Sequence, residues 1–198
     1  MSADDETLAV YGAKADDYAA LFEADAETNR HLARFMAALP AGGRALDLGC
    51  GPGGAAAALA DAGFRVDAID AVAEMVAMAA RHPGVTAWRA RFDDIAGDAL
   101  YDGIWANFSL LHAARADLPR HLAALRTALK PGGVFHIGMK TGRSERRDSL
   151  GRLYTYYTEA ELRALLRDAG FVPGPGVTGR GKGLSGSDDP WVVILADG

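Results

Sequence analysis

Apolar residues along this chain form short continuous runs that alternate with stretches of helical spacing. A buried strand gives a run of four to eight apolar residues, whereas a helix places apolar residues three or four positions apart. Apolar residues between Leu32 and Leu39 have the helical spacing, and Pro40 follows them. Because proline ends a helix, we expect two helices over residues 4–39.

The remaining pattern predicts seven strands and four more helices. The expected strands comprise residues 44–48, 65–70, 85–90, 101–108 and 134–139, a segment from 171 onward, and 191–195. The expected helices comprise residues 53–62, 72–81, 118–129 and 158–169. Thr158 is a good N-cap for the last helix, and Glu161 completes a capping box. A glycine-rich connection joins the last two strands.

Strands that alternate with helices predict a parallel sheet covered on both faces. In such sheets ligands bind beyond the carboxyl ends of the strands. Residues 47–54, Asp70, Asp93 and Asp94, and residues 107–112 all follow expected strands. We therefore expect these residues to gather at one edge of the sheet.

Composition narrows the class of protein. The 198 residues suit one α/β domain, and 49% apolar with 24% charged residues is ordinary for a folded soluble protein. The net charge of −5 argues against nucleic-acid binding. The only cysteine, Cys50, excludes an intrachain disulfide and a cysteine-rich zinc site, so no metal is expected. Without a signal peptide or a membrane-spanning run of ~20 apolar residues, a cytoplasmic monomer or homodimer is expected.

The run at 46–54, LDLGCGPGG, predicts a site for a nucleotide-type cofactor, because glycines let the backbone approach a ligand closely. Its glycines match G-x-G-x-x-G, and Asp70 follows about 20 residues later, as in a dinucleotide site. Two residues oppose that interpretation. Pro52 removes an N–H donor, and Asp47 would place a carboxylate beside a pyrophosphate. The same carboxylate is favourable beside a cationic amino group or a sulfonium.

The sequence resembles the class I S-adenosylmethionine-dependent methyltransferases over nearly its whole length. Five motifs in order carry the resemblance: LDLGCGPGG at 46–54, VDAID at 66–70, YDGIWANFSLLHA at 101–113, LKPGGVFHIG at 129–138 and TEAELRALLRDAGF at 158–171. The stretches IWANFSLLH and GRLYTYYTEAEL look most like the small bacterial branch that is called tellurite-resistance-like.

The resemblance implies a Rossmann-like, doubly wound α/β fold. Its seven-stranded, mostly parallel sheet would have an antiparallel last strand and helices on both faces. A single domain over 1–198 would carry an N-terminal helical cap over the cofactor at 1–40 and a substrate-side loop at 140–158. The implied cofactor is S-adenosylmethionine, with S-adenosylhomocysteine as its product.

The resemblance also implies roles for individual residues. Asp70 would accept both ribose hydroxyls, and Asp93 or Asp94 would accept from the adenine amino group. The other residues expected at the cofactor are Tyr11, Tyr18, Asp47, Gly49, Cys50, Gly51, Ala71, Met75 and Asn107. Cys50 is expected there for its small size and not for its reactivity.

His112 is the candidate general base, because it follows the fourth strand on the cofactor edge; the alternative is a local structural role. A basic segment after the fifth strand suits a carboxylate, phosphate or oxyanion, although a solvated loop explains it equally well. The substrate-binding candidates are Lys140, Arg143, Arg146, Arg147, Tyr154 and Tyr157. Alternation along an extended chain would point Tyr154 and Tyr157 in opposite directions.

These observations together predict methyl transfer to a small molecule, for which an anion is one option. Two rivals remain at this point. One is a regulatory protein that binds the cofactor without transferring methyl, and the other is an NAD-type oxidoreductase that binds a dinucleotide.

Overall fold

The computed structural model describes residues 4–22 and 26–198. The α-helices are α1 (Asp5–Ala13), α2 (Ala15–Phe22), α3 (Ala26–Ala37), α4 (Gly54–Asp61), α5 (Ala73–Ala79), α6 (Leu118–Ala128) and α7 (Glu159–Asp168). The short 3-10 helices are η1 (Phe92–Asp94) and η2 (Leu110–His112). The strands are β1 (Arg44–Leu48), β2 (Arg65–Asp70), β3 (Val85–Arg89), β4 (Tyr101–Asn107), β5 (Leu129–Lys140), β6 (Glu145–Arg147), β7 (Leu153–Thr155), β8 (Val172–Lys182) and β9 (Asp188–Asp197).

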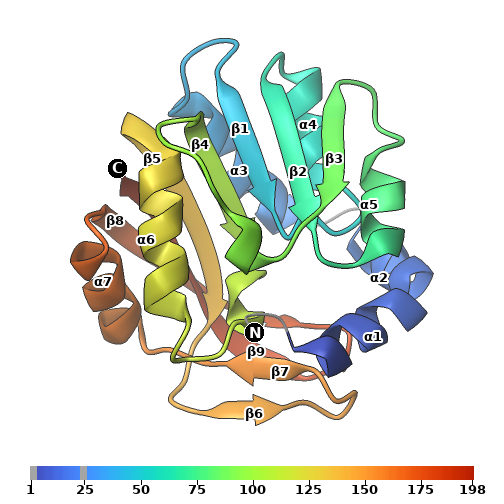
Figure 1. Ribbon diagram of the computed structural model, residues 1–198. Coiled ribbons are helices and arrows are strands. Elements are labelled where there is room, and N and C mark those ends of the chain that lie inside the picture. Colours follow the sequence, from blue (N-terminus) through green and yellow to red (C-terminus); the bar gives the residue numbers. More distant parts are fainter. Residues whose placement is uncertain (1–3, 23–25) are drawn as a thin grey trace.

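Seven strands form one sheet in the order β3-β2-β1-β4-β5-β9-β8 (Figure 1). The first five pair in parallel, and β9 runs antiparallel to both β5 and β8. The strand order reverses between β1 and β4, so the carboxyl ends of these two strands form the crevice in which open α/β sheets bind ligands. The expected fold class, a Rossmann-like sheet with an antiparallel last strand, is confirmed.

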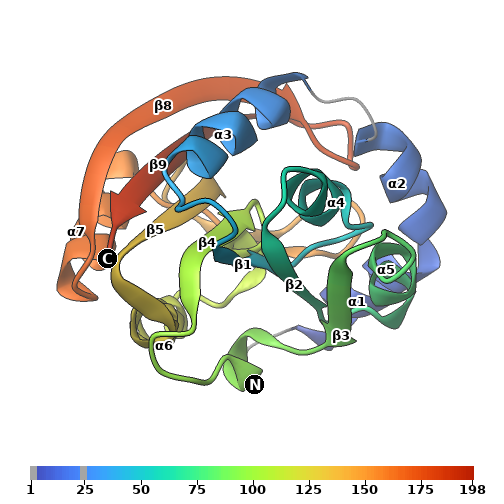
Figure 2. The same ribbon diagram turned by 90° about the horizontal axis from the view of Figure 1, so that it is seen from above.

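Helices cover both faces of the sheet, as the view from above shows (Figure 2). On one face, α3 and α4 pack on β1, β2 and β4 through a cluster that includes Phe35, Leu59 and Trp105. On the other face, α6 and α7 pack through a larger cluster that includes Leu122, Phe135 and Leu166. Because both faces are buried, the central strands have the continuous apolar runs seen in the sequence. No helix in the described part of the chain is long and apolar enough to cross a membrane.

The structure differs from the predicted elements at both ends of the chain. Three helices occupy the region for which two were expected, because Lys14 leaves the helical conformation between α1 and α2. Residues 1–3 and 23–25 of the expected cap lie outside the described residues. The glycine-rich stretch that was expected to connect the last two strands belongs largely to β8. Glycine at position 179 leaves room for the ring of Trp191, since a Cβ there would lie 2.3 Å from it.

The segment expected as a substrate-side loop, 140–158, contains a small two-stranded sheet instead of irregular chain throughout. β6 and β7 pair antiparallel, with Arg146 opposite Tyr154. This β6–β7 hairpin lies beyond the carboxyl ends of the parallel strands, next to α1 (Figure 1). Its position therefore brings residues 145–155 close to the first helix of the chain.

The capping box of α7 is present as predicted, and it offers a test of local stability. Thr158 Oγ1 accepts from the backbone N–H of Glu161 at 3.2 Å, and Glu161 Oε2 accepts from the backbone N–H of Thr158 at 2.8 Å. Replacement Thr158→Ala removes this acceptor and should lower the free energy of unfolding by about 1 kcal/mol in urea denaturation. Thr158→Ser keeps the hydroxyl and should stay close to wild type; equal losses in both variants would contradict the capping role.

Candidate functional site

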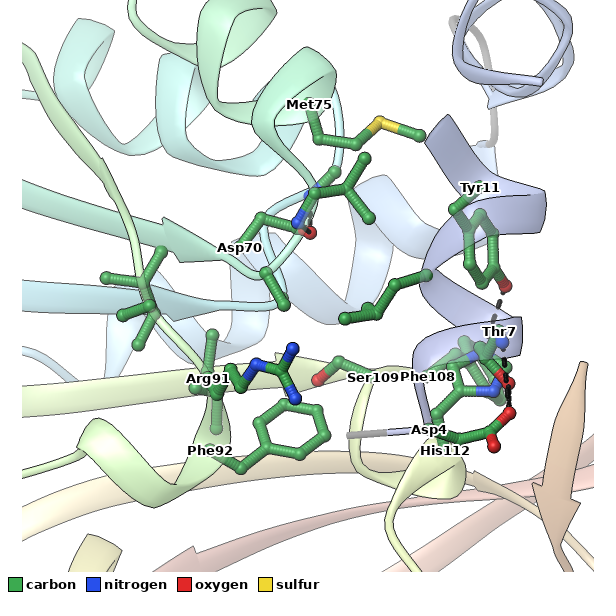
Figure 3. Close-up of a pocket in the computed structure, with 18 of the residues that line it drawn as sticks. Asp4, Thr7, Tyr11, Asp70, Met75, Arg91, Phe92, Phe108, Ser109 and His112 are labelled. Carbon is green, nitrogen blue, oxygen red and sulfur yellow. Dashed lines mark hydrogen bonds between the residues drawn. The ribbon is translucent and has the colours of Figure 1, made fainter. Parts of the chain in front are cut away.

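A cavity with an empty volume of about 750 Å³, including its open mouth, lies at the carboxyl ends of the parallel strands. In Figure 3, α1 contributes Thr7 and Tyr11 on one side of the cavity, and Asp70 and Met75 lie on the opposite side. The cavity therefore lies between the sheet edge and the first helix.

The loop after β1 turns tightly against the neighbouring strands. The backbone N–H groups of Gly49 and Cys50 both donate to the carbonyl of Ile69, at 2.8 and 3.0 Å. Gly49 has a φ of +70°, and a Cβ there would lie 2.4 Å from the Cβ of Ser109. Only glycine satisfies both constraints, which explains the first glycine of the motif.

Asp70 at the end of β2 organises this loop and lines the cavity. Its Oδ2 accepts from the backbone N–H of Gly51 at 3.0 Å, and its Oδ1 accepts from that of Val72 at 2.9 Å. Burial raises the pKa of Asp70, and these backbone donors oppose the increase. The backbone N–H of Ala71 is a third donor to this carboxylate, which still has acceptor capacity for a ligand hydroxyl.

Asp47 lies behind the loop and does not line the cavity. It is buried, and its Oδ2 has no hydrogen-bond partner among the described residues. Burial, followed by the charge of Asp70, raises the pKa of Asp47 to about 7, and the backbone N–H of Ala56 opposes that increase. In the described part of the chain, no basic side chain forms an ion pair with Asp47 or Asp70. The neighbouring Cys50 is also buried off the cavity, and burial raises the pKa of its thiol, so it is not a reactive thiolate.

The acids after β3 lie outside the cavity. Asp93 pairs with Arg120, and Asp94 accepts from the backbone N–H of Arg91 at 2.8 Å, so the turn of η1 directs both carboxyls away from the cavity. The two residues before them, Arg91 and Phe92, line the cavity instead (Figure 3). The sequence located the segment after β3 that borders the cavity, but not which of its side chains face the cavity.

Asn107, Phe108 and Ser109 line the cavity at the end of β4. The amide oxygen of Asn107 lies 3.1 Å from Nε2 of His136, so that imidazole donates to it and leaves the amide N–H groups for other partners. Phe108 has a φ of +56°, which a bulky side chain rarely adopts. Such backbone conformations cluster at functional sites.

His112 lies at the far end of the cavity, where three segments meet. Its Nδ1 lies 2.6 Å from the carbonyl of Leu153, which can only accept, so Nδ1 carries the proton. Its Nε2 therefore accepts from the hydroxyl of Tyr11 at 2.9 Å. Burial lowers the pKa of His112 to about 4, so the imidazole is neutral at pH 7. A neutral imidazole with an acceptor nitrogen has the protonation state that a general base requires.

The basic segment is largely neutralised, and none of its predicted substrate-binding residues lines the cavity. Lys140 pairs with Asp189 at 2.7 Å, and Arg147 donates to Asp4 at 2.7 and 2.8 Å. Arg143 and Arg146 are exposed, with Arg146 over the ring of Tyr156. The buried ring of Tyr154 packs on His112 with a centroid distance of 4.7 Å, and Tyr157 packs beneath Arg115.

Most of the residues expected at the cofactor meet in this one cavity. Those that line it are Tyr11, Tyr18, Gly49, Gly51, Asp70, Ala71, Met75 and Asn107, together with the candidate base His112. Lining residues that sequence reasoning missed include Asp4, Thr7, Leu8, Val72, Arg91, Phe92, Phe108 and Ser109. Val72, Phe92 and Phe108 each directly neighbour a predicted residue, whereas Asp4, Thr7 and Leu8 come from the start of α1, where the sequence carried no such signal.

The charges of the site favour a cationic ligand. Asp47 and Asp70 repel each other, and no basic partner compensates them within the described chain. S-adenosylmethionine carries an ammonium and a sulfonium group, which fit this pair of acids, whereas the pyrophosphate of a dinucleotide would add to their repulsion. The residues present therefore fit the methyl donor and not the dinucleotide.

Comparisons with known proteins agree with this geometry. A family model described as a methyltransferase domain matches residues 22–173. No curated protein matches the sequence. Among solved structures, the 1,6-didemethyltoxoflavin-N1-methyltransferase of Burkholderia thailandensis, with 1,6-didemethyltoxoflavin and S-adenosylhomocysteine bound, is 27% identical, with a TM-score of 0.77 over 100% of this chain and 91% of that one.

Two further solved structures share the fold at lower identity. The Haloferax volcanii putative methyltransferase in complex with the Trm112 activator is 20% identical, with a TM-score of 0.77 over 96% of both chains. The [4+2]-cyclase SpnF is 20% identical, with a TM-score of 0.68 over 86% of this chain and 79% of that one.

The narrower resemblance to the tellurite-resistance-like branch stays a prediction. On the family match and the full-length structural similarity, the chain belongs to the methyltransferase-domain family and is an S-adenosylmethionine-dependent methyltransferase.

Proposed function

We propose that the chain methylates a small molecule through an O–H or ring N–H group that meets His112 at the end of the cavity. The observation that carries this proposal is the placement of one cavity between Asp70, with the uncompensated Asp47 buried behind it, and the neutral imidazole of His112. The acids suit the cofactor, and the imidazole suits a substrate that must lose a proton.

On the cofactor side, Asp70 would bind the ribose hydroxyls, and Gly49 and Gly51 would let the methionine part lie against the loop. Arg91 and Phe92 border the space next to Asp70, where the adenine would lie. They take the place that the sequence suggested for Asp93 or Asp94. When bound, S-adenosylmethionine supplies a methyl group on a positively charged sulfur.

On the substrate side, Nε2 of His112 would receive the proton that the nucleophile loses as its bond to the methyl carbon forms. The nucleophile would first replace the Tyr11 hydroxyl at Nε2, because that nitrogen has one lone pair. A pKa of about 4 makes His112 a weak base. It therefore suits protons that become acidic during methylation, such as those of a phenol, an enol or a ring nitrogen.

The substrate end of the cavity favours a molecule with little net charge. Thr7, Leu8, Tyr11 and Phe108 surround His112 there, and the nearby cations Lys140 and Arg147 already have carboxylate partners. A bound anion would have to compete with Asp189 or Asp4. The Burkholderia thailandensis N1-methyltransferase, which has 1,6-didemethyltoxoflavin bound in its structure, supports a small molecule with a nitrogen acceptor.

The proposed acceptor and base are tested by incubating the protein with methyl-labelled S-adenosylmethionine and a panel of small phenols, enols and nitrogen heterocycles. Label in a product, lost in His112→Gln, is the expected result. Tight S-adenosylhomocysteine binding without label in any product of the panel would contradict the proposed acceptor class, and label that persists in His112→Gln would contradict the role of His112 as base. We further expect a cytoplasmic monomer or homodimer that does not bind nucleic acid.

The ribose assignment predicts the effect of removing the Asp70 carboxylate. Asp70→Ala should weaken S-adenosylhomocysteine binding by about 1.5–3 kcal/mol, the contribution of charge-assisted hydrogen bonds, when measured by calorimetry. Asp61→Ala removes the same charge from the exposed end of α4 and should leave the affinity unchanged. Equal affinity in Asp70→Ala and wild type would refute the assignment.

The raised pKa of Asp47 predicts how stability depends on pH in the protein without cofactor. The folded state keeps this carboxyl protonated up to about pH 7, whereas the unfolded chain releases the proton near the ordinary aspartate pKa of 3.8. Stability from this group is therefore present at low pH and is lost as pH rises toward 7. Relative to wild type, Asp47→Asn should gain about 2 kcal/mol between pH 5 and pH 8 in urea denaturation.

Asp16→Asn, an exposed substitution in α2, is the matched control and should show no such gain. A difference between Asp47→Asn and wild type that stays constant from pH 5 to pH 8 would show that Asp47 is ionised throughout this range.

A further inference from the structure

A buried ion pair lies directly behind the wall of the cavity at His112. The side chain of Arg152 is 1% exposed, and its Nε and Nη2 both donate to Oδ2 of Asp148, at 3.0 and 2.6 Å. Oδ1 of Asp148 accepts the backbone N–H groups of Leu150 and Arg152. Burying such a pair costs desolvation energy that apolar residues would avoid, so stability alone gives little reason for it.

The remaining nitrogen of this guanidinium reaches the site. Nη1 of Arg152 donates to the hydroxyl oxygen of Tyr11 at 2.7 Å. Because a guanidinium has no acceptor, the hydroxyl proton of Tyr11 must point elsewhere, and Nε2 of His112 lies 2.9 Å away. The guanidinium also lies over the rings of Tyr11 and Tyr154, at 5.0 and 5.1 Å from their centroids.

Two consecutive residues, Arg152 and Leu153, therefore determine the hydrogen bonds of both ring nitrogens of His112. The carbonyl of Leu153 fixes the proton on Nδ1, and Arg152, acting through Tyr11, directs a donor to Nε2. The arrangement joins α1, η2 and the start of β7, which are far apart in the sequence.

The groups around His112 shift its pKa in both directions. Burial lowers the pKa most, and the hydrogen bond to the carbonyl of Leu153 raises it. The positive charges of Arg152 and Lys140 lower it again, while the negative charge of Asp148 opposes them. The other titratable groups that contact the imidazole are the rings of Tyr11 and Tyr154, and burial raises the pKa of both phenols, so they are neutral.

We propose that Arg152, held by Asp148, is a positioning residue for the transfer reaction: it orients the Tyr11 hydroxyl toward Nε2 of His112 and places a positive charge beside the imidazole that disfavours its protonation. This inference rests on the proposed function, in which Nε2 receives the proton of the substrate. It adds that the geometry and protonation of the base are set from the β6–β7 hairpin.

Nitrogen-15 NMR titration of the histidine side chains in the full-length protein tests this inference. His112→Gln identifies the resonances of His112. In wild type, His112 should show the Nδ1–H form and should not titrate above about pH 5. In Arg152→Met, the pKa of His112 should rise by at least about one unit, because the nearby positive charge is lost. Arg152→Lys keeps the charge and should restore a low value.

Arg147→Met is the matched control, because Arg147 also joins the hairpin to α1, through Asp4, but makes no contact with Tyr11 or His112. It should leave the pKa of His112 unchanged. An unchanged pKa in Arg152→Met, or an equal rise in Arg147→Met, would overturn the positioning role.

Two further measurements keep the result interpretable. If Arg152→Met fails to fold, Tyr11→Phe removes only the linking hydroxyl; the Nε2 resonance should then shift while Nδ1 stays protonated, and an unshifted Nε2 overturns the inference. Calorimetry with S-adenosylhomocysteine on the same samples separates the two proposals. If the wild type does not bind S-adenosylhomocysteine, the proposed function is contradicted. If the wild type binds it but Arg152→Met leaves the pKa of His112 unchanged, only the positioning role is contradicted.

Discussion

Two neighbouring carboxyls at the ends of β1 and β2 are the constraint on which the site depends. Burial disfavours their charged forms, and no basic side chain among the described residues compensates them. Parallel pairing places Leu48 opposite Ile69, so Asp47 and Asp70 come to adjoining strand ends. The loop that follows donates its N–H groups to Ile69 and Asp70, which leaves Oδ2 of Asp47 without a partner. Asp70 therefore lines the cavity and Asp47 is buried behind it, and neither carboxyl has a basic partner among the described residues.

The opposite wall comes from segments that are distant in sequence. α1 is held by polar contacts: Asp4 with Arg147, Thr7 Oγ1 with the backbone N–H of Leu153, and Tyr11 with Arg152. These contacts place the first helix across the crevice and bring Tyr11 to His112. One set of interactions therefore both closes the cavity and orients the group that faces the substrate.

The sheet and its cofactor edge could be predicted because they depend on local patterns. Apolar runs, the glycines at 46–54 and the capping box at Thr158 each specify backbone geometry within a few residues. The direction of side chains in the turn after β3 could not be read from the sequence. There, Asp93 and Asp94 suggested a ligand contact, but the hydrogen bond of Asp94 to the turn leaves Arg91 and Phe92 at the cavity.

The ion pairs of the basic segment could not be predicted from the sequence either, because the acidic partners are distant along the chain. Arg147 finds Asp4, 143 positions away, and Lys140 finds Asp189, 49 positions away. For the same reason the sequence did not indicate a role for Arg152, whose contact with Tyr11 spans 141 positions. Charge patterning alone showed positive residues near the site but not which of them were neutralised.

If the carboxyls of Asp47 and Asp70 select a cationic cofactor, cofactor binding must change the titration of Asp47, which carbon-13 NMR of its carboxyl carbon measures. Without ligand, its pKa should lie at about 7. Saturation with S-adenosylhomocysteine, whose ammonium group would supply the missing positive charge, should lower that pKa by at least about one unit. An Asp47 pKa that is already in the ordinary range without ligand, or that does not change on binding, would contradict the account.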